Sequence, residues 1–230
     1  MRTLLLLFSF FSLLNAFSVE EKQMFKSGKK LYKQTCISCH GKDGQTNKNI
    51  QLIIKPRRLQ ETILTQEQSF KVIKEGARFW GAHSEFMPAF KPLFNDKQIS
   101  SIAFYISKAF NPARDQRIQK LLQESKANTL SKKELLKIGA KIFKRNCSHC
   151  HGKTGNGKSI YIEKSKTNKL FIYPYNLTRT LLDKNQIFLY AKYGGYFWGA
   201  DGTHMPSWKK KYNDEELKSV AEYIDKKINR

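Results

Sequence analysis

The sequence has little that could cross a membrane or build a β-sheet. No stretch shows the convincing apolar alternation of a strand, so we predict an all-α protein. The longest apolar run, residues 4–14, is too short for a transmembrane helix, which needs about 20 residues. It follows one arginine and precedes Ala16-Phe17-Ser18, which is typical of a secretory signal peptide over 1–18. We therefore expect an exported protein whose mature chain begins at Val19, with an uncleaved anchor or a buried helix as the alternative.

Cysteine is scarce, and its placement is more informative than its number. All four cysteines lie in two Cys-x-x-Cys pairs, each followed at once by histidine: CISCH at 36–40 and CSHCH at 147–151. No cysteine precedes Cys36, which argues against a lipoprotein anchor. A zinc site, a thiol redox pair and covalently attached haem all use such residues. A disulfide scaffold would not need the histidines.

The spacing of these motifs favours haem. A zinc ribbon separates its cysteine pairs by roughly 15–20 residues, whereas 107 residues lie between Cys39 and Cys147. A thioredoxin-like pair lies near a βαβ pattern, which this sequence lacks. Covalent haem needs two thiols for the two vinyl groups and an adjacent imidazole for the iron. We predict two covalently bound haem c groups, attached through Cys36, Cys39, Cys147 and Cys150, with His40 and His151 as iron ligands.

The chain is an internal duplication. GKKLYKQTCISCHGKDG (28–44) matches GAKIFKRNCSHCHGKTG (139–155) at an offset of 111 residues. Downstream, 76–108 matches 194–226 at an offset of 118, with 15 of 33 positions identical. The difference is one insertion of seven residues between His151 and Pro174. Two copies of one domain are therefore present.

Each half carries three helix-start signals. A capping box, in which Ser, Thr, Asp or Asn is followed three residues later by Glu or Gln, opens each predicted helix. The pairs are Ser18/Glu21, Thr65/Gln68, Asn95/Gln98, Ser131/Glu134, Asp183/Gln186 and Asn213/Glu216. We expect domains at 19–110 and 131–230, joined by a polar helical linker over 111–130. Three short helices make a thin core, which a large apolar group such as haem would complete.

Taken together, these motifs resemble class I cytochrome c. The resemblance rests on Gly-x-x-x-aromatic-x-x-x-Cys-x-x-Cys-His-Gly, a later Pro-x-x-Leu, a Met-Pro pair and a last helix with Tyr-Ile, and it covers essentially all of the mature chain. Two tandem copies behind a signal peptide resemble the dihaem, two-domain cytochromes c of bacterial periplasms. The family implies three helices around each haem, His/Met ligation and electron transfer. It also implies that Gly28 and Gly139 let the first helix cross closely over Tyr105 and Tyr223 of the last.

Two methionines occupy matching positions before the last helix, Met87 in FMPAF and Met205 in HMPSW. A thioether is a soft iron ligand that raises the reduction potential, and the proline that follows restricts the loop. We therefore predict both methionines as second axial ligands. His83 and His204 lie nearby and are rival ligands, each present in one half only, and His204 is the stronger rival because it directly precedes Met205.

Two further matched pairs are expected around each haem. The carbonyls of Pro56 and Pro174 would accept a hydrogen bond from the ligating histidines, since such a bond orients an imidazole ligand. Trp80 and Trp198, in the repeated FWGA, would cover the haem or donate to a propionate, with plain loop packing as the alternative.

Acidic residues are few: 19 stand against 42 lysines and arginines, for a formal net charge of +23. In an exported protein this favours acidic proteins or an anionic membrane surface, not nucleic acid, as partners; a merely solvated lysine-rich surface is the alternative. With both irons ligated on both sides, no substrate pocket is expected. We predict an electron carrier, not an enzyme, that meets an acidic terminal oxidase or reductase. The alternatives are a dihaem oxidoreductase, peroxidase- or thiosulfate-dehydrogenase-like, and a haem subunit of a membrane respiratory complex.

Overall fold

The computed structural model describes residues 17–46, 55–82, 87–125, 127, 129–158, 174–200 and 205–229, and over these ranges it is helical without any strand. The first half contains α2 (Val19–Thr35), α3 (Ile37–His40), η1 (Leu59–Glu61), α4 (Gln66–Glu75), η2 (Ala77–Trp80) and α5 (Asp96–Phe110). The second half contains α7 (Lys132–Ile142), η3 (Phe143–Cys147), α8 (Ser148–His151), η4 (Leu177–Arg179), α10 (Lys184–Tyr193), η5 (Tyr196–Trp198), α11 (Asp214–Tyr223) and η6 (Ile224–Ile228). The all-α prediction is confirmed.

All six predicted capping boxes are formed, and each opens a main helix. In each box, the side chain of the first residue accepts a hydrogen bond from the backbone N–H of the residue three positions later. The Glu or Gln side chain at that later position accepts a hydrogen bond from the backbone N–H of the first residue. Two of the helix's otherwise unpaired N–H groups are thereby satisfied. The sequence therefore predicted where the main helices begin.

In each half the first helix crosses the last at a glycine. A Cβ on Gly28 of α2 would lie 1.9 Å from the Ser101 carbonyl oxygen of α5, and one on Gly139 of α7 would lie 2.0 Å from that of Ser219 in α11. Neither distance is possible for a real side chain, so only glycine lets the backbones meet. A Cβ on Gly28 would also lie only 2.8 Å from the Cβ of Tyr105. The predicted close crossing is confirmed in both halves.

The predicted signal peptide ends directly before the first helix and contributes two contacts to it. Residues 1–16 lie outside the described residues, but Phe17 and Ser18 are described. The Phe17 ring packs 5.8 Å from the Phe25 ring and 5.6 Å from the Phe104 ring, centroid to centroid, and Ser18 caps α2. Cleavage before Val19 would remove both the cap and this ring contact. No helix among the described residues is long and apolar enough to cross a membrane.

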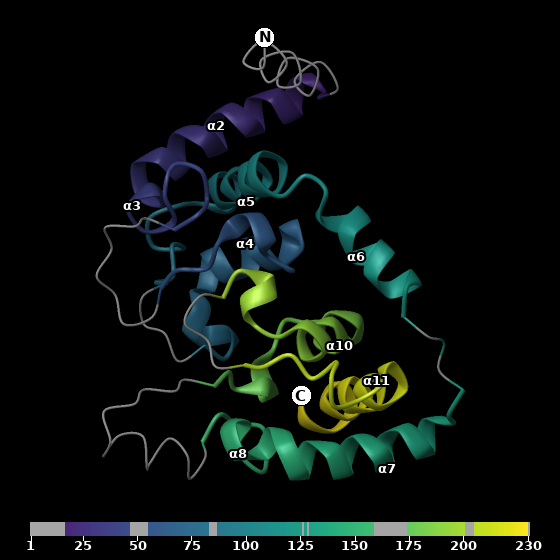
Figure 1. Ribbon diagram of the computed structural model, residues 1–230. Coiled ribbons are helices and arrows are strands. Elements are labelled where there is room, and N and C mark those ends of the chain that lie inside the picture. The colour runs from purple at the N-terminus through teal and green to yellow at the C-terminus, as the bar shows by residue number, and fades with distance from the viewer. Residues whose placement is uncertain are drawn as a thin grey trace.

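The linker carries helix α6 (Arg114–Gln123), which is packed against both halves. Arg114 donates to the Ile63 carbonyl from Nε (2.9 Å) and Nη2 (2.6 Å). The Arg117 guanidinium lies 5.1 Å from the centroid of the Trp198 ring in the second half. Ile118 is buried in the core cluster of that half, which also takes in Ile63 from the first. In Figure 1, α6 runs along one side of the molecule between the two halves.

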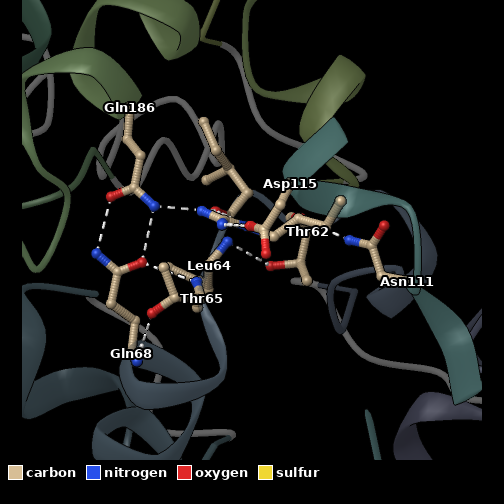
Figure 2. Close-up of polar contacts among 9 residues, drawn as sticks. Thr62, Leu64, Thr65, Gln68, Asn111, Asp115 and Gln186 are labelled. Carbon is tan, nitrogen blue, oxygen red and sulfur yellow. Dashed lines mark hydrogen bonds and ion pairs between the residues drawn. The ribbon is translucent and has the colours of Figure 1, made fainter. Parts of the chain in front are cut away.

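The two halves meet through α4 and α10, which lie between the α2/α5 pair and the α7/α11 pair (Figure 1). Gln68 and Gln186, at equivalent positions, exchange two 2.8 Å hydrogen bonds through their amides (Figure 2). Each also donates to a backbone carbonyl of the other half: Gln68 to Leu181 at 2.7 Å and Gln186 to Ile63 at 2.9 Å. All four residues obey the 118-residue offset, so the contact has the self-complementary form of a two-fold interface.

We expect Gln186→Ala to destabilise the protein more than Gln98→Ala. Gln98 occupies the same capping position in α5, so its loss should cost only the capping contribution, roughly 0.3–1.5 kcal/mol. Loss of Gln186 also removes its hydrogen bonds to the Gln68 amide and to the Ile63 carbonyl, each of which adds about 0.5–1.5 kcal/mol. Urea unfolding followed by circular dichroism measures both. Equal losses would mean that the glutamine pair does not join the halves.

Candidate functional site

Each Cys-x-x-Cys-His motif forms one short helical turn at the end of the first helix. The turns are α3 and α8, and each ends at a glycine with positive φ, Gly41 at 72° and Gly152 at 78°. A turn of helix places residues three apart on the same face, so both thiols of a motif lie beside its histidine. The turn that follows the histidine requires glycine, because other residues rarely adopt this backbone conformation.

The histidine rings are oriented by backbone carbonyls. Nδ1 of His40 lies 3.1 Å from the Arg57 oxygen, and Nδ1 of His151 lies 2.9 Å from the Tyr175 oxygen. A carbonyl can only accept, so Nδ1 carries the proton and Nε2 keeps its lone pair for a metal. Burial lowers the pKa of both imidazoles, which the hydrogen bond to the carbonyl only partly opposes. Both rings are therefore neutral, as a ligand to iron must be.

The predicted source of these carbonyls was wrong by one residue in each half. We expected Pro56 and Pro174, but the accepting oxygens belong to the next residues. The Pro56 oxygen instead accepts from the Thr46 hydroxyl at 2.8 Å. The sequence located the segment, whereas the choice of carbonyl depends on how the backbone turns past the ring.

The thiols are unlinked, and burial disfavours the ionised form of three of them. All four cysteines are free. Burial, with a smaller contribution from the neighbouring cysteine, raises the pKa of Cys36 and of Cys147 to about 12, and burial also raises the pKa of Cys150. Zinc binds thiolates, which such surroundings disfavour. Among the described residues, no three His, Cys, Asp or Glu side chains cluster closely enough to hold a metal ion.

The two Met-Pro segments are anchored by equivalent backbone bonds. The Met87 carbonyl accepts from Ala77 N–H and the Met205 carbonyl from Gly195 N–H, both at 3.0 Å. Gly76 and Gly194 pack closely against these segments. A Cβ on Gly76 would lie 2.8 Å from the backbone N of Ala89, and a Cβ on Gly194 would lie 2.8 Å from that of Ser207. Met87 packs on the same core cluster as Cys36. His83 and His204, the rival ligands, lie outside the described residues.

The indole N–H groups of Trp80 and Trp198 are already bonded within the protein, so they are not available to a haem propionate, which was one of their two predicted haem roles. The Trp80 indole donates to the Lys71 carbonyl at 3.1 Å, and the Trp198 indole donates to the Leu189 carbonyl at 3.2 Å. Both N–H groups are thus used inside their own half, and loop packing explains them. Trp208, which we did not single out, has a buried Nε1 without a hydrogen-bond partner in the part of the chain that is described. The equivalent residue in the first half is Phe90.

The segments that hold the histidines also form the contact between the halves. Arg58, next to the carbonyl that holds His40, donates its N–H to the Gly199 carbonyl at 2.8 Å. Asn176, next to the carbonyl that holds His151, donates to the Gly81 carbonyl at the same distance. A Cβ on Gly81 would lie 2.3 Å from the Asn176 oxygen, which explains glycine there. The repeated FWGA motif therefore supplies these glycines, a role its sequence did not reveal.

These residues fit covalently bound haem c. Each half offers two free thiols and one oriented, neutral imidazole within one turn, and a separately anchored methionine. The Trp208 N–H is suited to an acceptor that the described residues do not provide. Free thiols beside one buried, oriented imidazole match haem attachment better than they match zinc or thiol exchange.

Comparison with known proteins agrees. The family model described as cytochrome C oxidase, cbb3-type, subunit III matches residues 23–106 and again 134–224. The chain is 25% identical over 199 residues to the cbb3-type cytochrome c oxidase subunit FixP of Azorhizobium caulinodans, covering 86% of this chain and 57% of that protein. It is 24% identical over 153 residues to the cytochrome bc1 complex cytochrome c subunit of Mycobacterium leprae, covering 61% of this chain and 45% of that one.

The chain thus spans about half the length of the curated relatives it matches. Among solved structures, a chain of the Kuenenia stuttgartiensis reducing HAO-like protein complex is similar with a TM-score of 0.45 and 20% identity, over 89% of this chain and 96% of that chain. That similarity is too low to define the fold. The family match covers both halves, and with it the protein belongs to the cytochrome c oxidase, cbb3-type, subunit III family, with a class I c-type cytochrome domain in each half.

Proposed function

We propose that the protein is an exported electron carrier with two haem c groups, each ligated by histidine and methionine. Family membership implies covalently bound haem c and supports an electron-carrying role. The observation that carries the proposal is the equivalent orientation of His40 and His151 beside two neutral thiols. When bound, haem c supplies an iron that takes up and releases one electron.

In this proposal each part of the chain has one task. Cys36, Cys39, Cys147 and Cys150 would hold the haem covalently, and His40 and His151 would bind the iron through Nε2. Met87 and Met205 would be the second ligands of the two irons and would keep both sites closed to substrates, so that the protein carries electrons and does not catalyse a reaction. Domain boundaries at 110 and 131, with α6 as the linker, complete the arrangement.

A second candidate is a haem subunit of a respiratory complex. The relatives are named as subunits of a bc1 complex and of a cbb3-type oxidase, and the chain covers only part of each. In either role the partner is another redox protein. We propose that it is acidic, because α2 and α7 each present exposed basic side chains that form none of the ion pairs among the described residues. These residues are Lys26, Lys29, Lys30 and Lys33 on α2, and Lys132, Lys133, Lys137, Lys141, Lys144 and Arg145 on or just after α7.

Two haems per chain is the first expected outcome. A pyridine haemochrome assay should give two covalent haems, and one should remain after Cys147→Ser with Cys150→Ser. The equivalent variant of the first half, Cys36→Ser with Cys39→Ser, should also retain one covalent haem. Circular dichroism should show partial loss of helix in both, because each thin core is built on its haem. One haem in the wild-type protein would contradict the proposal.

Methionine ligation is tested by Met87→Ala and Met205→Ala. Each should open one iron to carbon monoxide and lower one of the two midpoint potentials, because the soft thioether favours ferrous iron. Met24→Ala is the control, since Met24 packs on the core of the first half and should leave both sites closed. If His204→Ala opens the second iron and Met205→Ala does not, histidine is the ligand there.

Attraction of anionic partners is tested with small redox reagents of opposite charge. Oxidation by hexacyanoferrate(III) should slow steeply as ionic strength rises, because salt screens charges beyond about 10 Å at 0.1 M. Oxidation by a cationic cobalt complex should speed up instead. Replacing Lys29, Lys30 and Lys33 by Gln should weaken the salt dependence, whereas replacing the same three by Arg, which keeps the charge, should not. Flat dependence for both reagents would leave these lysines as solvated surface.

A further inference from the structure

Arg57 touches the haem sites of both halves. Its backbone oxygen orients His40 of the first half. Its guanidinium crosses to the second half, where it lies 5.6 Å from the ring centroids of both Tyr175 and Tyr190. Tyr175 is the residue whose oxygen orients His151. One side-chain contact therefore links the two backbone positions that hold the two iron-ligating histidines.

Arg57 forms no ion pair within the part of the chain that is described. The side chains found at its guanidinium there are the phenols of Tyr175 and Tyr190. Arginine stays protonated in proteins, and aromatic faces stabilise its charge. The neighbouring Arg58 differs, because its Nη1 lies 3.4 Å from Glu61 Oε1. A lasting positive charge without an ion-pair partner among the described residues therefore lies where the Arg57 and Tyr175 segments meet.

The duplication makes this charge asymmetric. Arg57 and Tyr175 are equivalent positions, with equivalent backbone roles, but only the first half has a cation there. The surrounding contacts are symmetric, with crossed backbone bonds from Arg58 and Asn176 to glycines of the opposite half. The difference is thus confined to the side chain, within a backbone frame that is the same in both halves.

We propose that Arg57 is a positioning residue that raises the reduction potentials of both haem sites from one place in the inter-domain contact. This rests on the proposed function. A positive charge near iron stabilises the ferrous over the ferric state, because the ferric site carries one more positive charge. The crossed backbone bonds hold the Arg57 and Tyr175 segments together, so the charge acts on the second site although Arg57 belongs to the first.

The test is a spectroscopic redox titration of the full chain carrying Arg57→Gln. At a fixed ambient potential, the ferrous-to-ferric ratio should fall by roughly tenfold at each haem, which is about 59 mV for a one-electron couple. Met87→Ala and Met205→Ala, each lowering one potential, assign the two waves to the two halves. Arg57→Lys keeps the charge and should restore most of both potentials. Arg58→Gln, which removes a charge already paired with Glu61, should shift them less.

Three results would overturn the proposal. They are a shift confined to the haem of the first half, equal shifts in Arg57→Gln and Arg58→Gln, and no recovery in Arg57→Lys. If Arg57→Gln does not fold, Arg57→Met replaces it, because methionine also removes the charge while keeping an unbranched apolar side chain. Unchanged potentials in Arg57→Met would reject the proposal. A haemochrome assay giving fewer than two haems in the wild-type protein would instead reject the proposed function.

Discussion

The hydrogen bond from each histidine Nδ1 to a backbone carbonyl is the constraint on which the rest depends. It fixes the tautomer, turns Nε2 toward the position a metal would take, and helps keep the ring ordered in a buried place. The carbonyls belong to Arg57 and Tyr175, and the next N–H in each case donates to the opposite half. Ligand orientation and domain packing therefore share the same two short segments, so a change in one disturbs the other.

The duplication explains why the contacts between the two halves occur in equivalent pairs. Two copies of one domain can meet through identical surfaces, and each favourable contact then occurs twice. The glutamine pair shows this, since Gln68 and Gln186 each cap their own helix and bond to the other's amide. Once the symmetric contacts are recognised, the unequal positions become informative. Arg57 opposite Tyr175, and Phe90 in place of Trp208, are where the two sites acquire different surroundings.

Much of this could be predicted from the sequence because the signals were local. Capping boxes, the Cys-x-x-Cys-His turns and the glycine crossings depend on residues close in the chain or on one matched pair, and all are present. What could not be predicted depends on contacts between the halves. Nothing in FWGA indicates that its glycine meets Asn176 or Arg58 of the other copy, and nothing in KPRRL indicates which carbonyl faces His40. The placement of two similar domains relative to one another depends on many weak contacts, and none of these contacts has a sequence motif.

The arrangement bears on how a two-site carrier would work. The basic helices α2 and α7 lie at opposite ends of the molecule in Figure 1. The segments that orient the histidines instead bond to the opposite half, through Arg58 and Asn176. Redox partners that bind to the basic faces of α2 and α7 would therefore not compete with the contact between the two halves. That contact is braced by α6, whose Arg114 and Arg117 bond to carbonyls of η1 and its neighbours and whose Ile118 is buried in the other half. Because α6 is packed against both halves, the separation of the two histidine sites is set by the fold.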